Sequence, residues 1–178
     1  ASKLESMRAA KLGFKAYHAD DATLIGDLHK ILQLVETDMT LFYRGLADLK
    51  VEQENQTDDE LLAPIYEAYY VEAELTPENT ATICDWLRRY QQRIHADGTP
   101  DNERRVAMNA VNPKYVFRNY LAQLATDKAE QGDFSLVNEL LTVLKHPYDE
   151  QEDKAHFAVK RPEWARQRAG CSMLSCSS

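Results

Sequence analysis

The chain has 178 residues, of which 44% are hydrophobic and 28% charged, and its formal net charge is −8. These values are ordinary for a soluble globular protein, and the length allows one domain, or one domain with a tail, to bury a sizeable core. Residues 1–111 hold 12 Lys and Arg against 20 Asp and Glu, whereas residues 112–178 hold 9 of each. The acidic balance excludes nucleic acid as the expected partner, because phosphate binding requires clustered positive charge.

Arginines occur in two short groups, one around Arg88, Arg89 and Arg93 and one at Arg104 and Arg105. Both groups stand among acidic residues, so we interpret them as solvated helix faces. No run of residues reaches the ~20 apolar positions of a membrane span, and the N-terminal stretch lacks the apolar core of a signal peptide. The 3 cysteines are too few and too widely spaced for a disulfide framework. We therefore expect no membrane partner and a reducing, cytoplasmic compartment.

The spacing of apolar residues predicts helices almost throughout the chain. Three capping residues, Thr76, Thr99 and Asn112, directly precede prolines, which suit the first position of a helix. Gly98 and Gly132 follow periodic stretches and indicate helix ends. The last predicted helix has five apolar residues on one side: Phe134, Val137, Leu140, Leu141 and Leu144. The predicted helices span residues 3–13, 21–35, 37–49, 58–74, 77–95, 100–109, 113–130 and 134–145.

The predicted fold is all-α, an antiparallel bundle of about eight helices with an irregular C-terminal arm. Short connections favour antiparallel neighbours, and no stretch has the alternating pattern of a β-strand. We assign residues 1–146 to the bundle and residues 147–178 to an extended tail that ends in Cys-Ser-Ser. Tyr148, Phe157 and Trp164 are expected to hold this arm against the bundle.

The residues whose side chains could take part in catalysis or metal binding are not arranged in a recognisable catalytic, cofactor or metal site. The 6 glycines are never closer than 13 residues apart, so no glycine-rich phosphate-binding loop is present. Asp153 and His156 lie three residues apart in an irregular stretch, where solvated polar residues are the favoured interpretation over metal ligands. Glu67 and Glu74 suit the solvated side of a helix better than paired acid–base catalysis, and Cys84 is expected to be a small buried hydrophobe.

The segment MNAVNPKYVFRNYLAQ, residues 108–123, has two interpretations. In the first, which the residue types favour, Asn112 caps a core helix whose first turn begins at Pro113 and whose second turn exposes Arg118. In the second, Arg118 and Asn119 form hydrogen bonds to another surface and anchor the bundle to it.

The runs MNAVNPKYVFRNYLAQLA, EQGDFSLVNELLTVLKHPYDE and RPEWA, with the final SCSS, resemble the C-terminal region of the selenoprotein O family. The opening MRAAKLGF resembles the start of that region, whereas Cys171 and the acidic stretch 50–75 match no motif of the family. The resemblance implies a larger protein with a protein-kinase-like body. That body uses ATP and Mg²⁺ or Mn²⁺ to transfer AMP to Ser, Thr or Tyr hydroxyls of proteins. Its ATP- and metal-binding residues map onto no position of this chain.

The resemblance also implies a role for Cys176, because animal members have selenocysteine at the corresponding position. Our first hypothesis is a C-terminal helical domain of a bacterial protein adenylyltransferase, inactive alone, whose partners are the kinase-like body of the same polypeptide and the protein substrates. Cys176 would give redox control, and Asn112, Arg118 and Asn119 would dock on the body. A local Cys171–Cys176 disulfide is a further hypothesis.

Two alternatives remain. The second hypothesis is a stand-alone helical interaction module with no catalytic link, in which the apolar stripes bind a partner helix and the tail cysteines are incidental. The third, which we favour least, is an independent helical enzyme.

Overall fold

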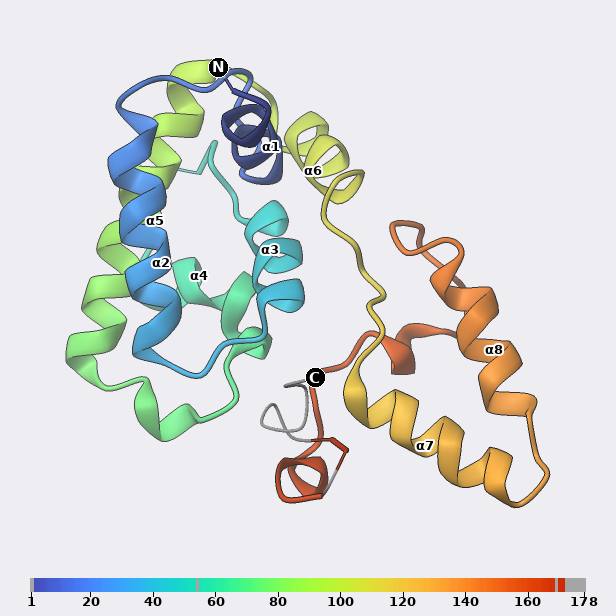
Figure 1. Ribbon diagram of the computed structural model, residues 1–178. Helices are drawn as coiled ribbons and strands as arrows, with labels where there is room; N and C mark the ends of the chain where they lie inside the picture. Colours follow the sequence, from blue (N-terminus) through green and yellow to red (C-terminus); the bar gives the residue numbers. More distant parts are fainter. Residues whose placement is uncertain (1, 54, 169, 172–178) are drawn as a thin grey trace. The chain divides into compact units, whose positions relative to one another are not determined.

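The computed structural model describes residues 2–53, 55–168, 170 and 171 (Figure 1). Over these residues the secondary structure is helical, apart from one isolated bridge between Thr37 and Tyr69. This confirms the all-α prediction. The chain forms two compact units, Ala1–Asn112 and Pro113–Ser178. The predicted division into a helical bundle over residues 1–146 and an extended tail over residues 147–178 stays a prediction.

Within residues 2–53 and 55–112, the first unit contains six α-helices and two short 3-10 helices. Thr76 caps α5 by accepting a hydrogen bond from the Asn79 N–H at 3.2 Å, and the left-handed Gly98 follows its last turn, as the sequence predicts. The elements are α1 (Lys3–Lys11), α2 (Asp21–Leu34), α3 (Met39–Asp48), α4 (Asp58–Leu62), η1 (Ala63–Ala68), η2 (Glu72–Glu74), α5 (Pro77–Asp97) and α6 (Asp101–Asn109).

The core of the first unit is built around aromatic residues of α5. Trp86 and Tyr90 lie one turn apart, are fully buried, and stack with their ring centroids 5.3 Å apart. The indole Nε1 of Trp86 donates a hydrogen bond to the Leu24 carbonyl at 2.8 Å, which ties α5 to the neighbouring α2 (Figure 1). The Tyr90 hydroxyl donates to the Leu12 carbonyl at 2.8 Å. Both polar atoms are therefore satisfied inside an apolar core.

Arg104 is buried at 1% exposure, so its interpretation as part of a solvated face is wrong. Its guanidinium donates hydrogen bonds to the carbonyls of Leu46, at 3.1 Å, and Leu49, at the C-terminal end of α3. It also contacts the Asp101 carboxylate at 3.3 Å. The last carbonyls of a helix have no partner within the helix, so Arg104 is held in the interior as their cap.

A single helix over residues 58–74 is not formed, because Pro64 interrupts it. Proline lacks a backbone N–H and its ring conflicts with the carbonyl four residues earlier, so α4 ends at Leu62 and η1 follows. After η1 the backbone is extended, and the Tyr70 N–H donates to the Glu36 carbonyl at 2.9 Å. η1 packs directly against α3. The approach is so close that a Cβ at Gly45 of α3 would meet the Pro64 carbonyl of η1.

The second unit contains α7 (Asn119–Glu130), α8 (Ser135–Leu144), η3 (Ala155–Phe157) and η4 (Glu163–Arg166). The predicted helix start at residue 113 is wrong by six residues, since α7 begins at Asn119. The N–H groups of Lys114 and Tyr115 instead donate to the Pro147 carbonyl, at 2.7 and 3.0 Å. This pairing holds the segment before α7 against the segment that follows α8.

The segment after Pro147 contributes to the core of the second unit. Phe157 is 3% exposed, as expected for a residue that holds the arm, whereas Tyr148 and Trp164 are 44% and 48% exposed. Trp164 nevertheless contacts the ring of Tyr120 edge-on, with centroids 6.3 Å apart. The Gln151 side chain donates to two carbonyls at the end of α8, those of Val143 and His146, at 2.9 and 2.8 Å. The irregular arm is thus packed against α7 and α8 by its own side chains.

Candidate functional site

Asn112, one of the three residues predicted to dock, is 1% exposed and lies within the first unit. Its Nδ2 donates to the carbonyls of Lys11 and Met108 at 2.9 and 3.0 Å, and its Oδ1 accepts from the Lys11 ammonium at 3.1 Å. The amide therefore joins the end of α1 to the end of α6, and it does not cap a following helix. A docking role for Asn112 stays a prediction.

Arg118 and Asn119 lie next to each other at the start of α7, in the second unit. Arg118 has an extended backbone, with φ −83° and ψ 142°, and occupies the N-cap position of α7. Both side chains are partly exposed. The structure thus puts these two residues together and Asn112 in the other unit, and docking through Arg118 and Asn119 stays a prediction.

Two of the three cysteines are described, and both are buried free thiols. Cys84 is fully buried in α5, as predicted, and removal from water together with the nearby Asp58 carboxylate raises the pKa of its thiol to about 12. A thiol with such a raised pKa is a poor nucleophile at neutral pH. Cys171 is 2% exposed and packs in the core of the second unit. Cys176, the predicted redox residue, lies outside the described residues.

The carboxylates considered for acid–base or metal chemistry are dispersed. Glu67 lies in η1 and Glu74 in η2, where Glu74 accepts a hydrogen bond from the Glu36 N–H at 2.9 Å. Asp153 has a left-handed backbone, with φ 60°, just before η3, which carries His156. Among the described residues, no group of three His, Cys, Asp or Glu side chains is placed to hold a metal ion. Within the same residues, no helix is both long and apolar enough to cross a membrane.

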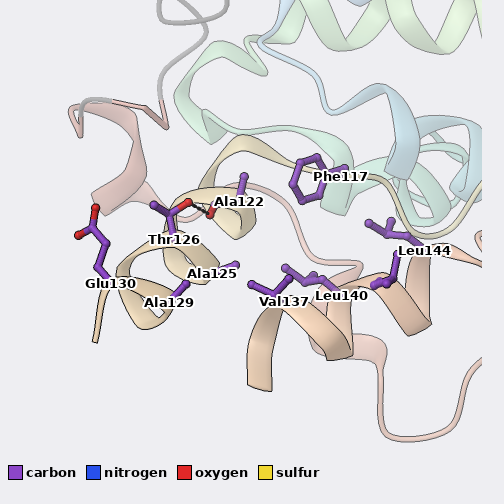
Figure 2. Close-up of a pocket in the computed structure, with 10 residues that line it drawn as sticks. Phe117, Ala122, Ala125, Thr126, Ala129, Glu130, Val137, Leu140 and Leu144 are labelled. Carbon is purple, nitrogen blue, oxygen red and sulfur yellow. Dashed lines mark hydrogen bonds between the residues drawn. The ribbon is translucent and has the colours of Figure 1, made fainter. Parts of the chain in front are cut away.

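The most distinctive surface of the second unit is an apolar groove between α7 and α8, which we call the α7–α8 groove (Figure 2). Its volume is about 690 Å³. Figure 2 shows Phe117 and Glu130 toward opposite ends of it. Its lining residues are Phe117, Ala122, Ala125, Thr126, Ala129, Glu130, Val137, Leu140, Leu141 and Leu144.

The α7 wall is made mostly of small residues, and the α8 wall mostly of large ones. Ala122, Ala125 and Ala129 recur at helical spacing on α7, so the groove is wide on that side. The hydroxyl of Thr126 donates to the Ala122 carbonyl at 3.0 Å and is already satisfied. Glu130 is then the one ionisable residue of the lining. The groove can therefore bind apolar surface and offers little for a charged or hydrogen-bonding ligand.

Several large apolar side chains of this groove face solvent in the second unit. Phe117 is 62% exposed, Leu141 55% and Val137 40%. Phe134, at the N-cap of α8 and outside the groove lining, is 59% exposed. Of the five apolar residues predicted to share one side of the helix that is now α8, only Leu140 is buried, at 3% exposure. The sequence signal was the five-residue apolar stripe itself, which is wider than the contact between α7 and α8 can cover. The sequence identified the stripe, and the second hypothesis, the interaction module, gave such apolar stripes a binding role without saying which residues are exposed.

Comparison with known proteins shows that the chain matches a protein family. Residues 1–145 match the family described as "Protein adenylyltransferase SelO". A protein from Rhodopirellula baltica named "Protein nucleotidyltransferase YdiU" is 55% identical over an alignment of 181 positions, gaps included, which covers 97% of this chain and 34% of that protein. Proteins of the same name from Aromatoleum aromaticum and Xanthomonas axonopodis pv. citri are 52% and 48% identical, over 97% and 96% of this chain.

The shares covered in the relatives are much smaller. The matches cover 32% of the Aromatoleum and Xanthomonas proteins. The chain thus spans about a third of the length of the curated relatives it matches.

Proposed function

Because the chain belongs to the SelO family of protein adenylyltransferases, we propose that it is the C-terminal helical domain of a protein nucleotidyltransferase. In this proposal the domain supports a kinase-like catalytic body and is not a catalyst by itself. The observation that carries it is the coverage of the relatives: the match takes in 97% of this chain and only 34% of the Rhodopirellula protein. The catalytic body belongs to the remaining length.

ATP and Mg²⁺ or Mn²⁺ are expected to bind to that body. The residues described here do not suit them, because the glycines are too far apart for a phosphate-binding loop and no three candidate metal ligands converge. The proposed activity is transfer of AMP to Ser, Thr or Tyr hydroxyls of protein substrates.

The activity is tested with the longer protein that carries this chain. It is incubated with a protein substrate and with ATP labelled in either the α- or the γ-phosphate. AMP transfer puts the α label on the substrate and leaves the γ label in solution, whereas phosphate transfer gives the opposite result. Label from γ-labelled ATP alone would refute adenylyl transfer. The 178-residue chain alone, used as the matched control, is expected to transfer neither label.

The second part of the proposal is redox control by Cys176 in a cytoplasmic protein. Oxidation by a peroxide would join the Cys176 thiol to a thiol of the body, with loss of two protons and two electrons, while the peroxide is reduced to water. The full-length protein is expected to lose AMP transfer on peroxide treatment and to regain it with dithiothreitol. Cys176→Ser should abolish this response, and Cys171→Ser, which alters a buried thiol, should retain it. A peroxide response that persists in Cys176→Ser contradicts the role.

The α7–α8 groove also favours the second candidate, a stand-alone interaction module, since an apolar groove suits a partner helix. The coding sequence upstream of Ala1 distinguishes the two candidates. A kinase-like region in the same reading frame supports the adenylyltransferase domain, and a start codon close to Ala1 supports the module.

A further inference from the structure

We propose that the α7–α8 groove binds an amphipathic helix contributed by the part of the longer polypeptide that lies outside this chain. The inference rests on the proposed function, in which this chain is one domain of a larger protein. It goes further by naming the surface that joins the domain to the rest and the kind of element that covers it.

The first step is the amount of apolar surface that this small unit exposes. Phe117, Val137 and Leu141 all line one groove and are 62%, 40% and 55% exposed. Single exposed apolar residues are common on protein surfaces, but a continuous apolar groove marks a binding site. Removing apolar area from water provides the free energy of association, about 25 cal/mol for each Å².

The second step is the lining of the groove, which suits the apolar face of a helix. Helices bind in grooves by inserting large apolar side chains at positions i, i+3, i+4 and i+7. The row of Ala122, Ala125 and Ala129 leaves space for such side chains beside the larger residues of α8 (Figure 2). Small-molecule sites add a few precisely placed polar groups. Here the Thr126 hydroxyl is already bonded within α7.

The third step identifies the source of the helix. The relatives extend over about three times the length that this chain matches, since the match covers 32–34% of them. A helix in the same polypeptide has an effective concentration in the millimolar range, so even a modest apolar contact is saturated. The residues that line the groove, 117–144, all lie within the stretch that matches the family, residues 1–145.

The test is photocrosslinking in the longer protein. Leu141 is replaced by the photoreactive p-benzoylphenylalanine, and a control protein carries the same residue at Thr142, which is exposed on α8 and does not line the groove. We expect Leu141 to give crosslinked peptides from outside residues 1–178, at several-fold higher yield than Thr142. Peptide mapping by mass spectrometry identifies the partner peptide, and mixing with isotope-labelled protein separates crosslinks within a chain from those between copies.

Three results would overturn the proposal: crosslinks from Leu141 to residues 1–112, crosslinks to a second copy, or a yield no higher than that of Thr142. A second measurement compares Leu141→Asp with Thr142→Asp in the longer protein. We expect the first to lower the melting temperature by several degrees more than the second, and equal values would contradict the proposal. AMP transfer is measured separately. A protein that forms the expected crosslink and transfers no AMP refutes the proposed function and leaves the groove contact intact.

Discussion

Gly45 and Gly26 provide a matched pair of substitutions that tests how closely α3 approaches η1. Both glycines lie inside α-helices, Gly45 in α3 and Gly26 in α2. A Cβ built at Gly45 would lie 2.1 Å from the Pro64 carbonyl oxygen and 3.1 Å from the Ile65 Cα. A Cβ at Gly26 would meet nothing within 4 Å. The same change, Gly→Ala, therefore separates packing from helix propensity.

The two expected effects have opposite signs. Alanine gains about 1 kcal/mol of helix propensity over glycine, so Gly26→Ala should raise the unfolding free energy of the first unit by roughly 0.5–1 kcal/mol. At Gly45 the neighbouring atoms are backbone, which cannot rotate away, so α3 and η1 must separate by about 1 Å or more. Overpacking of this kind costs about 1–3 kcal/mol or more. After the propensity gain, Gly45→Ala should lower the unfolding free energy by up to about 2 kcal/mol.

Urea titration followed by tryptophan fluorescence measures both variants. The chain has 2 tryptophans, so the Trp164→Phe background leaves buried Trp86 as the reporter of the first unit. We expect the urea midpoint to fall in Gly45→Ala and to rise in Gly26→Ala, with unchanged slopes. Equal midpoints for the two variants would show that the contact between Gly45 and Pro64 does not constrain the fold.

Three further predictions concern buried groups. Arg104→Met should lower the unfolding free energy of the first unit by about 3–5 kcal/mol, because it leaves the end of α3 uncapped and Asp101 without its cation. The Arg105 side chain is 56% exposed, so Arg105→Met should change this unfolding free energy by about 0.5 kcal/mol or less in the same urea titration. Cys84 should resist iodoacetamide at pH 8 until urea is added, and rapid labelling of the native protein in peptide maps would contradict this. Because folding raises the pKa of the Cys84 thiol from 9.0 to about 12, the protonated thiol contributes to the stability of the folded state. This contribution is complete below pH 9 and is lost as the pH rises toward 12. Phe157→Ala should destabilise the second unit by about 3–5 kcal/mol, as measured by thermal unfolding. Tyr148 is already 44% exposed, so Tyr148→Ala should destabilise the unit by much less. Similar losses for the two variants would show that the arm is not part of that core.

Local sequence signals predicted both ends of α5, which are set by its own residues. Thr76 and Gly98 cap α5 by contacts within a few residues, and both were identified from the sequence. The signals were insufficient where a distant group takes the backbone N–H donors. The Asn-Pro pair at residues 112 and 113 is typical of a helix start, yet the next two N–H groups donate to the Pro147 carbonyl, more than 30 residues away. A local pattern carries no information about such a distant acceptor.

The burial of Arg104 was missed for a related reason. Arg104 and Arg105 are the same residue type in adjacent positions, and the helix turns by about 100° between them. One guanidinium reaches the carbonyls at the end of α3, and the other remains 56% exposed at its side chain. Only the three-dimensional position of α3 decides which of the two is buried.

The apolar side of α8 shows what a sequence pattern can establish about function. Periodicity predicts that Val137, Leu140 and Leu141 share one side of a helix, because helix geometry alone fixes that relation. It does not state what covers that side, since a core within the chain and a contact with another segment favour the same residue types. In the second unit, α7 and the arm cover Leu140 and leave Leu141 55% exposed. The remaining apolar surface is therefore available to a partner, and the proposed partner is a helix from the rest of the longer polypeptide.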